Sequence, residues 1–281
     1  MSRIKLVALD LDGTLFNHKS QITPKTVTAI QKALHAGVHV VISTGRPAVG
    51  IPMEEIQKTD IRYAITTNGS GIYQLNPREC IYENSMDKEI VLPIIDFLMT
   101  KDIHMDAFIH GGAYSPTKCR EVAYKLDMPE ALRHYIVDTR IRKDDLAGFI
   151  REENLTVQKM TLNFYPLLDG TLKDREEVKA FLLANPNIQC VSGGYNNLEF
   201  TKAGVTKGVG LFALAKHLGI SMEETMAIGD TENDISILEA AGLGVAMENA
   251  TEEVKAVADI VTGSNENDGV AEAINQYVLV S

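Results

Sequence analysis

Two short apolar runs near the start of the chain, each ending in a polar turn, enclose an amphipathic segment. The runs are residues 4–9 and 38–42, and their length and continuity are typical of strands buried in a parallel sheet. Between them Thr23 can cap a helix with Pro24 at its first position, and Gly37 can end it. A right-handed crossover then places both strands in one parallel sheet, with their C-terminal ends at the same edge.

The last third of the chain repeats this alternation. A helix signal that starts at Thr206 stops at Gly219, and a capping box follows from Ser221 to Glu224. The pattern predicts strands at residues 225–228, 243–247 and 260–262, and helices at 206–217, 234–241, 251–258 and 269–278. We therefore predict an α/β fold with a doubly wound, Rossmann-like parallel-sheet core.

The middle of the chain has a different pattern. From about residue 86 to 193 it combines a helix, a hairpin turning near Gly111 and Gly112, an alternating segment at 157–165, a helix at 172–183 and a further strand. This order predicts an inserted α+β unit. We divide the chain into a core of residues 1–84 and 195–281 and an inserted α+β cap domain of residues 85–194, with crossings near Asn84 and Gly194.

Composition argues against several classes of partner. A formal net charge of −11 without a basic block repels nucleic-acid phosphates and anionic lipid. Cys80, Cys119 and Cys190 lie far apart without zinc-ligand spacing, so we expect free thiols in a reducing compartment. No segment approaches the ~18 apolar residues of a membrane span. We expect a cytoplasmic protein that binds neither nucleic acid nor membrane.

Two acidic clusters follow predicted strands of the core. Asp10 and Asp12 come directly after the first strand, and Asp230 and Asp234 follow the strand at 225–228. Carboxylates that converge at one sheet edge would hold one another protonated unless a cation neutralised them, and an all-oxygen donor set suits Mg²⁺. We therefore predict a magnesium site. The alternative, a polar turn and an acidic helix start, accounts for only part of the two clusters.

Basic and hydroxyl side chains are predicted at the same edge. Lys207 sits in the first turn of a helix, where its charge opposes the helix dipole. It could reach a bound phosphate, or it could be a solvated lysine. Thr44, Gly45 and Arg46 close the second strand, where they could bind phosphate oxygens or orient a carboxylate. A basic run at 140–143 could hold an anionic substrate, or form a solvated face.

Taken in order, these motifs resemble the haloacid dehalogenase superfamily, and in detail its Cof-type sugar phosphatases. The motifs are Asp-x-Asp-Gly-Thr at Asp10, Ser-Thr-Gly-Arg-Pro at Thr44, Gly-Val-Thr-Lys-Gly around Lys207 and Gly-Asp-x-x-Asn-Asp at Asp230. Asn68-Gly69 and Leu198-Glu199 also resemble recurrent segments of this group, and the inserted region corresponds to its cap. The resemblance covers the whole chain.

The resemblance implies a phosphomonoester hydrolase acting on a small phosphorylated metabolite such as a sugar phosphate. Asp10 would attack phosphorus, and Asp12 would protonate the leaving alkoxide and then deprotonate water. Mg²⁺ would be held by Asp10, Asp230 and the backbone carbonyl of Asp12, with support from Asp234 and Thr231. The residues implied to bind phosphate are Leu11, Thr44, Gly45, Lys207 and Asn233, and those implied to support the substrate are Arg46, Asn68 and Gly69.

Two alternatives predict different chemistry. A phosphotransferase or mutase of the same superfamily would pass phosphate from Asp10 to a sugar hydroxyl. A signalling receiver domain would keep a stable phospho-aspartate as a switch, although the inserted unit has no place in it. The cap would choose the metabolite, with FMN and pyridoxal phosphate as further candidates.

Overall fold

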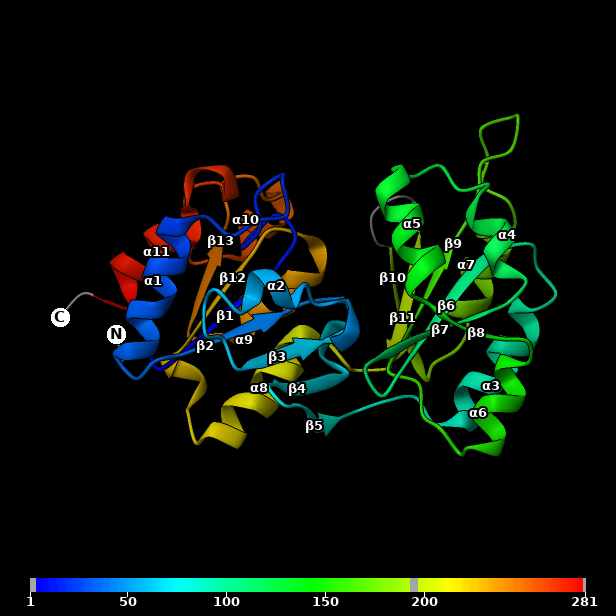
Figure 1. Cartoon of the computed structure of the whole chain (residues 1–281), viewed down its shortest axis with the longest axis horizontal. Helices are drawn as coiled ribbons and strands as arrows, with labels where there is room; N and C mark the ends of the chain where they lie inside the picture. The colour runs from blue at the N-terminus through cyan, green and yellow to red at the C-terminus, as the bar shows by residue number, and fades with distance from the viewer. Residues whose placement is uncertain (1–3, 193–196, 280–281) are drawn as a thin grey trace. The chain divides into compact units, whose positions relative to one another are not determined.

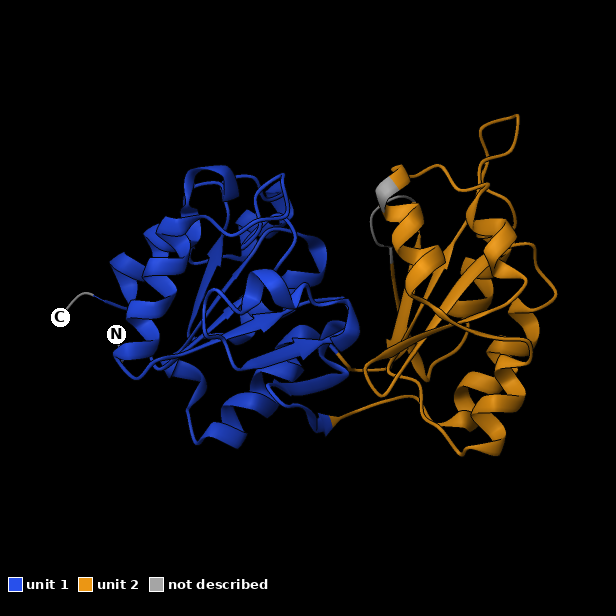
Figure 2. Ribbon diagram, viewed as in Figure 1, with its two compact units in different colours: residues 1–82, 206–281 blue, residues 83–205 orange. Residues whose placement is uncertain are grey.

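A computed structural model describes residues 4–192 and 197–279. The chain forms two compact units, Met1–Tyr82 with Thr206–Ser281 and Glu83–Val205 (Figure 2). The predicted crossing near Gly194 lies outside the described residues. Residues 198–205 group with the inserted unit, although the sequence placed them in the core, because their strand pairs with strands of that unit.

Unit 1 is the α/β core. Its strands are β1 (Leu6–Leu9), β2 (His39–Ser43), β3 (Tyr63–Thr66), β4 (Gly71–Leu75), β5 (Arg78–Glu83), β12 (Thr225–Gly229), β13 (Leu243–Ala246) and β14 (Ile260–Val261). Its helices are α1 (Pro24–His35), α2 (Met53–Ile56), α8 (Lys207–Leu218), α9 (Ile235–Ala240), α10 (Glu252–Val257) and α11 (Gly269–Tyr277). The sequence prediction of a parallel-sheet α/β core is confirmed.

The sheet of unit 1 runs in the order β14-β13-β12-β1-β2-β3-β4-β5, and its strands from β14 to β3 are parallel (Figure 1). The chain builds the sheet outward from β1 in one direction and from β12 in the other. Strands β1 and β12 therefore flank the topological switch point, where the C-terminal ends of strands open a crevice for ligands. Asp10 and Asp230 follow these two strands.

Helices cover both faces of this sheet because the buried strands are apolar on both sides. Helix α1, capped by Thr23 with Pro24 at its first position, packs with α11 against one face. Helices α8, α9 and α10 pack against the other face. The amphipathic pattern of α1, with Ile30 and Ala33 turned inward, accounts for its position.

Unit 2 is the inserted α+β unit. Its helices are α3 (Lys88–Leu98), α4 (Cys119–Ala123), α5 (Glu130–Thr139), α6 (Leu146–Glu152) and α7 (Arg175–Leu183). Its sheet has the order β10-β11-β9-β6-β7-β8, with strands β6 (His104–Ile109), β7 (Gly112–Pro116), β8 (Ile141–Lys143), β9 (Lys159–Asn163), β10 (Ile188–Ser192) and β11 (Leu198–Lys202). The predicted hairpin at Gly111 and Gly112 is confirmed as the β6–β7 turn.

The basic run at 140–143 is not a solvated face. The Arg140 side chain is 6% exposed, and its Nε donates to Asp106 Oδ2 across 2.8 Å. Arg142 donates to the carbonyls of Ile136 and Val137. The solvated-face alternative was wrong for Arg140 because its partner Asp106 lies in β6, and a local charge pattern cannot reveal such a distant partner. Across the described residues, no helix combines the length and apolar character needed to cross a membrane.

Candidate active site

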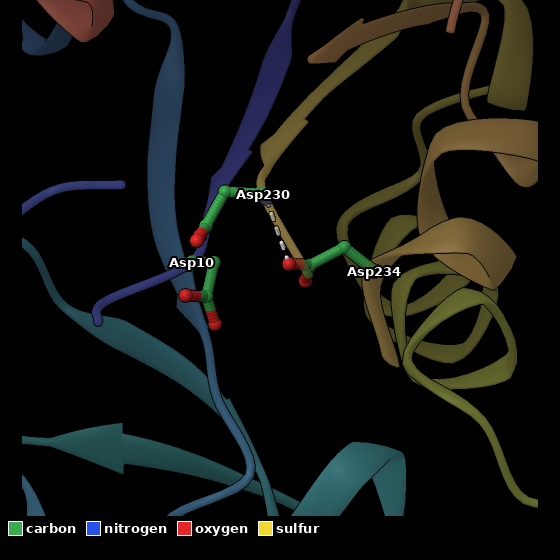
Figure 3. A group of neighbouring side chains, drawn as sticks. All are labelled: Asp10, Asp230 and Asp234. Atoms are coloured by element: carbon green, nitrogen blue, oxygen red, sulfur yellow. Dashed lines mark hydrogen bonds between the residues drawn. The ribbon is translucent and has the colours of Figure 1, made fainter. Parts of the chain in front are cut away.

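The pairing of β1 with β12 brings Asp10 and Asp230 together. Leu9 is in register with Ile228, and the amide of Asp10 donates to the Ile228 carbonyl across 3.0 Å. The first residue after each strand supplies a carboxylate: Asp10 after β1 and Asp230 after β12. Figure 3 shows the side chains of Asp10, Asp230 and Asp234 turned toward one another, and one carboxylate oxygen from each lies within 4.8 Å of the others.

Asp234 is fixed in a buried turn after β12. Its Oδ2 accepts hydrogen bonds from the amides of Asp230 and Thr231 at 3.0 and 3.1 Å. Gly229 makes room for this arrangement, since a Cβ at that position would overlap the Asp234 side chain. Backbone amides therefore already bind one oxygen of the Asp234 carboxylate and fix it beside the other two acids.

Lys207 lies between two of the carboxylates. Its Nζ is 2.7 Å from Asp10 Oδ1 and 2.6 Å from Asp234 Oδ1, and the residue is 1% exposed. The alternative of a solvated lysine is thus wrong. Burial by itself would lower the pKa of Lys207, but Asp10 and Asp234 outweigh it and raise the pKa well above its usual range. Asp10 and Asp234 therefore favour the charged form of the Lys207 side chain.

The acids outnumber this single cation. Burial, with added repulsion from Asp234 and Asp230, raises the pKa of Asp10 well above its ordinary value despite the opposing attraction of Lys207. Burial also raises the pKa of Asp230 to about 6. The cluster therefore resists full ionisation unless a further positive charge enters it.

Thr14 is a site residue whose role the sequence reasoning did not assign. Its hydroxyl donates to Asp230 Oδ1 across 2.7 Å. The preceding Gly13 has φ of +87°, and a Cβ there would overlap the Asp230 carboxylate. Both residues belong to the Asp-x-Asp-Gly-Thr motif, so the signal was present, but a hydroxyl partner 216 residues away is not visible in a local pattern.

Asp12 lies at the exposed side of the cluster. Its side chain is 55% exposed, and its two carboxylate oxygens accept from Arg46 Nη2 at 2.7 Å and Nε at 2.9 Å. The structure therefore brings Arg46 to the site as a partner of a carboxylate. Leu11, between the two aspartates, buries its side chain in the core, so only its backbone faces the turn.

The loops after β2 and β3 bring the remaining predicted residues to this edge. The amide of Arg46 donates to Thr44 Oγ1 at 3.1 Å, and the amide of Asn68 donates to the Thr44 carbonyl at 3.2 Å. Asn68 and Gly69 have φ of +57° and +100°, and a Cβ at Gly69 would overlap the Thr206 carbonyl. Gly45 lies in the same β2 turn.

Asn233 ties the β12 turn to these loops. Its Nδ2 donates to Asn68 Oδ1 at 3.3 Å, and its Oδ1 accepts from the Thr231 hydroxyl at 2.9 Å. The predicted residues after β1, β2, β3 and β12, together with the start of α8, are thus gathered at one sheet edge.

Comparison with known proteins agrees with this geometry. The sequence profile of the haloacid dehalogenase-like hydrolase family matches residues 7–274. Phosphatase YwpJ of Bacillus subtilis is 33% identical over 282 residues, which cover 95% of this chain and 98% of YwpJ. Pyridoxal phosphate phosphatase YbhA of Escherichia coli is 29% identical over 279 residues, which cover 98% of this chain and 99% of YbhA.

Solved structures give the same result. A haloacid dehalogenase-like hydrolase from B. subtilis superimposes with a TM-score of 0.80 at 30% identity, covering 97% of this chain and 99% of that one. The subclass IIB sugar phosphatase BT4131 gives a TM-score of 0.78 at 28% identity, covering 98% and 100%. The chain belongs to the haloacid dehalogenase-like hydrolase family and is a phosphatase of that superfamily.

Proposed function

We propose that this protein is a magnesium-dependent phosphomonoester hydrolase that acts on a small phosphorylated metabolite through a phospho-aspartate on Asp10. The observation that carries the proposal is the position of Asp10 at the switch point, where its carboxylate meets those of Asp230 and Asp234 within 4.8 Å and the Lys207 ammonium at 2.7 Å. A nucleophile, a cation-binding acid cluster and a fixed positive charge then share one crevice.

The donor set fits Mg²⁺. Among the described residues, Asp10 Oδ1 is bonded to Lys207 and Asp230 Oδ1 to Thr14, while the second oxygen of each carboxylate has no hydrogen-bond partner. Two carboxylate oxygens and a backbone carbonyl such as that of Asp12 form an all-oxygen set. When bound, Mg²⁺ would keep Asp10 ionised and neutralise charge on the transferring phosphoryl group.

Asp10 and Asp12 carry out the chemical steps of the two half-reactions. Asp10 attacks phosphorus and forms a P–O bond as the ester P–O bond breaks, and Asp12 gives its proton to the departing alkoxide. Asp12 then takes a proton from water, which attacks the phospho-aspartate and releases inorganic phosphate. Lys207, Asn233 and the loop of Thr44 and Gly45 hold phosphoryl oxygens, as does the Leu11 amide.

The names of relatives suggest which metabolites to test. YbhA is a pyridoxal phosphate phosphatase, YcsE of B. subtilis is a 5-amino-6-(5-phospho-D-ribitylamino)uracil phosphatase at 31% identity over 277 residues, and BT4131 is a sugar phosphatase. These substrates are phosphate monoesters of small polar alcohols. We propose a substrate of this class, chosen by side chains of the inserted unit.

The test is phosphate release from p-nitrophenyl phosphate, sugar phosphates, pyridoxal phosphate, FMN and the ribitylaminouracil phosphate, each with Mg²⁺ and with EDTA. Asp10→Asn should abolish turnover. It should also abolish the acid-stable attachment of labelled phosphate to the protein. Asp60→Asn is the matched control, because Asp60 is exposed in the loop between α2 and β3, and its φ of +64° suits asparagine equally.

Three results would refute the proposal in different ways. Equal rates for Asp10→Asn and wild type would exclude Asp10 as nucleophile. Added free sugar that diverts label from inorganic phosphate to a new sugar phosphate would indicate a phosphotransferase. A labelled protein that persists for minutes without turnover would indicate a phospho-aspartate switch.

A further inference from the structure

Asp12 and Arg46 form the exposed ion pair of the site. Both nitrogens at one side of the guanidinium donate to Asp12, Nε to Oδ2 at 2.9 Å and Nη2 to Oδ1 at 2.7 Å. Most exposed ion pairs contribute little, but a two-pronged arginine–carboxylate contact with fixed geometry is the exception. The pair therefore fixes both the position and the plane of the Asp12 carboxylate.

Arg46 is itself held from several directions. Its Nη1 donates to the Gly50 carbonyl at 3.1 Å, its amide donates to Thr44 Oγ1 at 3.1 Å, and its carbonyl accepts from the Thr67 amide at 3.0 Å. The guanidinium is thus anchored to the turn after β2. These contacts restrict the rotamers of the long Arg46 side chain independently of its contact with Asp12.

Asp12 has no such support of its own. In the described part of the chain, its carboxylate makes no hydrogen bond or ion pair except those with Arg46. It stands 55% exposed on the turn whose next residue, Gly13, has φ of +87°. Without Arg46 the Asp12 side chain would be free to rotate in solvent.

We propose that Arg46 is a positioning residue for Asp12, which holds the acid–base carboxylate where it can reach the leaving oxygen. The inference rests on the proposed function and refines it. Proton transfer requires the two heavy atoms to approach to about 2.6–3.2 Å, so a freely rotating Asp12 would transfer its proton less often. In this role Arg46 acts through Asp12, and direct contact with the phosphate is not its main function.

The chemistry of the leaving group distinguishes a role of Arg46 in positioning Asp12 from a role in binding phosphate directly. An alkyl phosphate releases a strongly basic alkoxide that requires a proton, whereas p-nitrophenyl phosphate releases a weakly basic phenolate that does not. Formation of the phospho-aspartate is measured in single turnover for both substrates, because this step precedes the attack of water. Loss of positioned Asp12 should slow the alkyl substrate selectively.

We expect Arg46→Ala to slow phospho-aspartate formation from the alkyl phosphate by about tenfold or more, within the range that general-acid catalysis supplies. The p-nitrophenyl rate should change much less. In an Asp12→Asn background, Arg46→Ala should cause no further loss, because its partner has already been removed. Added guanidinium ion should restore part of the alkyl rate in Arg46→Ala but not in the double variant.

Arg46→Lys keeps the charge but lacks the two-pronged geometry, so the alkyl rate should fall between those of wild type and Arg46→Ala. Arg62→Ala is the matched control, since Arg62 is an exposed arginine of the same unit at the other end of β3. Thermal unfolding of each variant establishes that it is folded.

Equal losses with both substrates, or an Arg46→Ala loss that persists in the Asp12→Asn background, would overturn the inference and assign Arg46 to phosphate binding. These outcomes leave Mg²⁺-dependent turnover by the wild type intact. A wild-type protein that forms no phospho-aspartate at all would instead overturn the proposed function, and this inference with it.

Discussion

The hydroxyl of Thr14 donates a hydrogen bond to Asp230 Oδ1 across 2.7 Å, and so joins two turns that are 216 residues apart in the chain. The contact is buried, with Thr14 1% and Asp230 7% exposed. It occupies one oxygen of Asp230, and the other has no hydrogen-bond partner among the described residues. Thr14 therefore orients a carboxylate that we propose as a metal ligand.

Thr14→Val should weaken Mg²⁺ binding and destabilise the fold. Valine has the same shape but no hydroxyl, so a buried acceptor loses its donor at a cost of about 1–3 kcal/mol. Denaturant unfolding and Mg²⁺ titration of the rate measure the two effects. Thr14→Ser, which retains the hydroxyl, should keep the wild-type metal affinity, and unchanged affinity in Thr14→Val would show that the bond does not orient the ligand.

Lys207→Met should abolish turnover and lower stability in metal-free buffer. Methionine leaves Asp10 and Asp234 without their common cation, and removing one partner of a buried ion pair costs about 3–5 kcal/mol. Mg²⁺ should recover part of this stability, because it brings positive charge to the same cluster. Lys216→Met, in the last turn of the same helix and exposed, is the control. Wild-type stability in Lys207→Met would show that the two contacts are energetically neutral.

Gly229→Ala should inactivate the enzyme by displacing Asp234. The added Cβ overlaps the Asp234 side chain, which is held by the amides of Asp230 and Thr231. Gly37→Ala is an informative contrast, because Gly37 has φ of +81° with nothing near its Cβ. It should cost about 1–2 kcal/mol through backbone strain and leave kcat unchanged. An active Gly229→Ala enzyme would mean that the turn can shift without consequence.

The metal-free protein should lose stability as the pH rises from about 4 to about 6 through the contribution of Asp230. The pKa of Asp230 is about 6 in the folded state against 3.8 for an unperturbed aspartate. The folded state therefore holds a proton that the unfolded state has released across this interval, so stability falls with rising pH.

The comparison with Asp230→Asn isolates this contribution. Asparagine removes the ionisation, so the variant should equal the wild type near pH 4 and exceed its metal-free stability at pH 7.5 by about 2 kcal/mol. Unfolding midpoints at a series of pH values with EDTA measure the difference. Saturating Mg²⁺ should reduce or reverse it in favour of the wild type. A difference that does not vary with pH would exclude the perturbed ionisation of Asp230.

The elements that determine the site could be predicted because their signals are local. Apolar runs, the Thr23 cap with Pro24, and the capping box at Ser221 specify strands and helices within a few residues. The handedness of a parallel crossover then places Asp10 and Thr44 at one edge without further information. The parallel-sheet core and its strand-end residues follow from these rules.

Side-chain partners were harder to predict because they depend on distant residues. Burial of Lys207, the Thr14 hydrogen bond and the Arg46 pair each join segments that only tertiary packing brings together. The same reason explains Arg140, whose partner Asp106 lies 34 residues earlier. Lys159 in β9 is likewise 2% exposed and paired with Glu199. A polar residue in this alternating segment therefore does not lie on a solvent-exposed face.

Asp10 and Lys207 are 197 residues apart in sequence, although their side chains are in direct contact. During synthesis on a ribosome, the whole inserted unit is therefore made after the first segment of the core and before the segment that contains Lys207. Until β12 pairs with β1, strand β1 is an edge strand, and the Asp10 carboxylate lacks the charged neighbours that it has in the folded protein. The proposed active site can thus assemble only after Lys207, Asp230 and Asp234 have been synthesised.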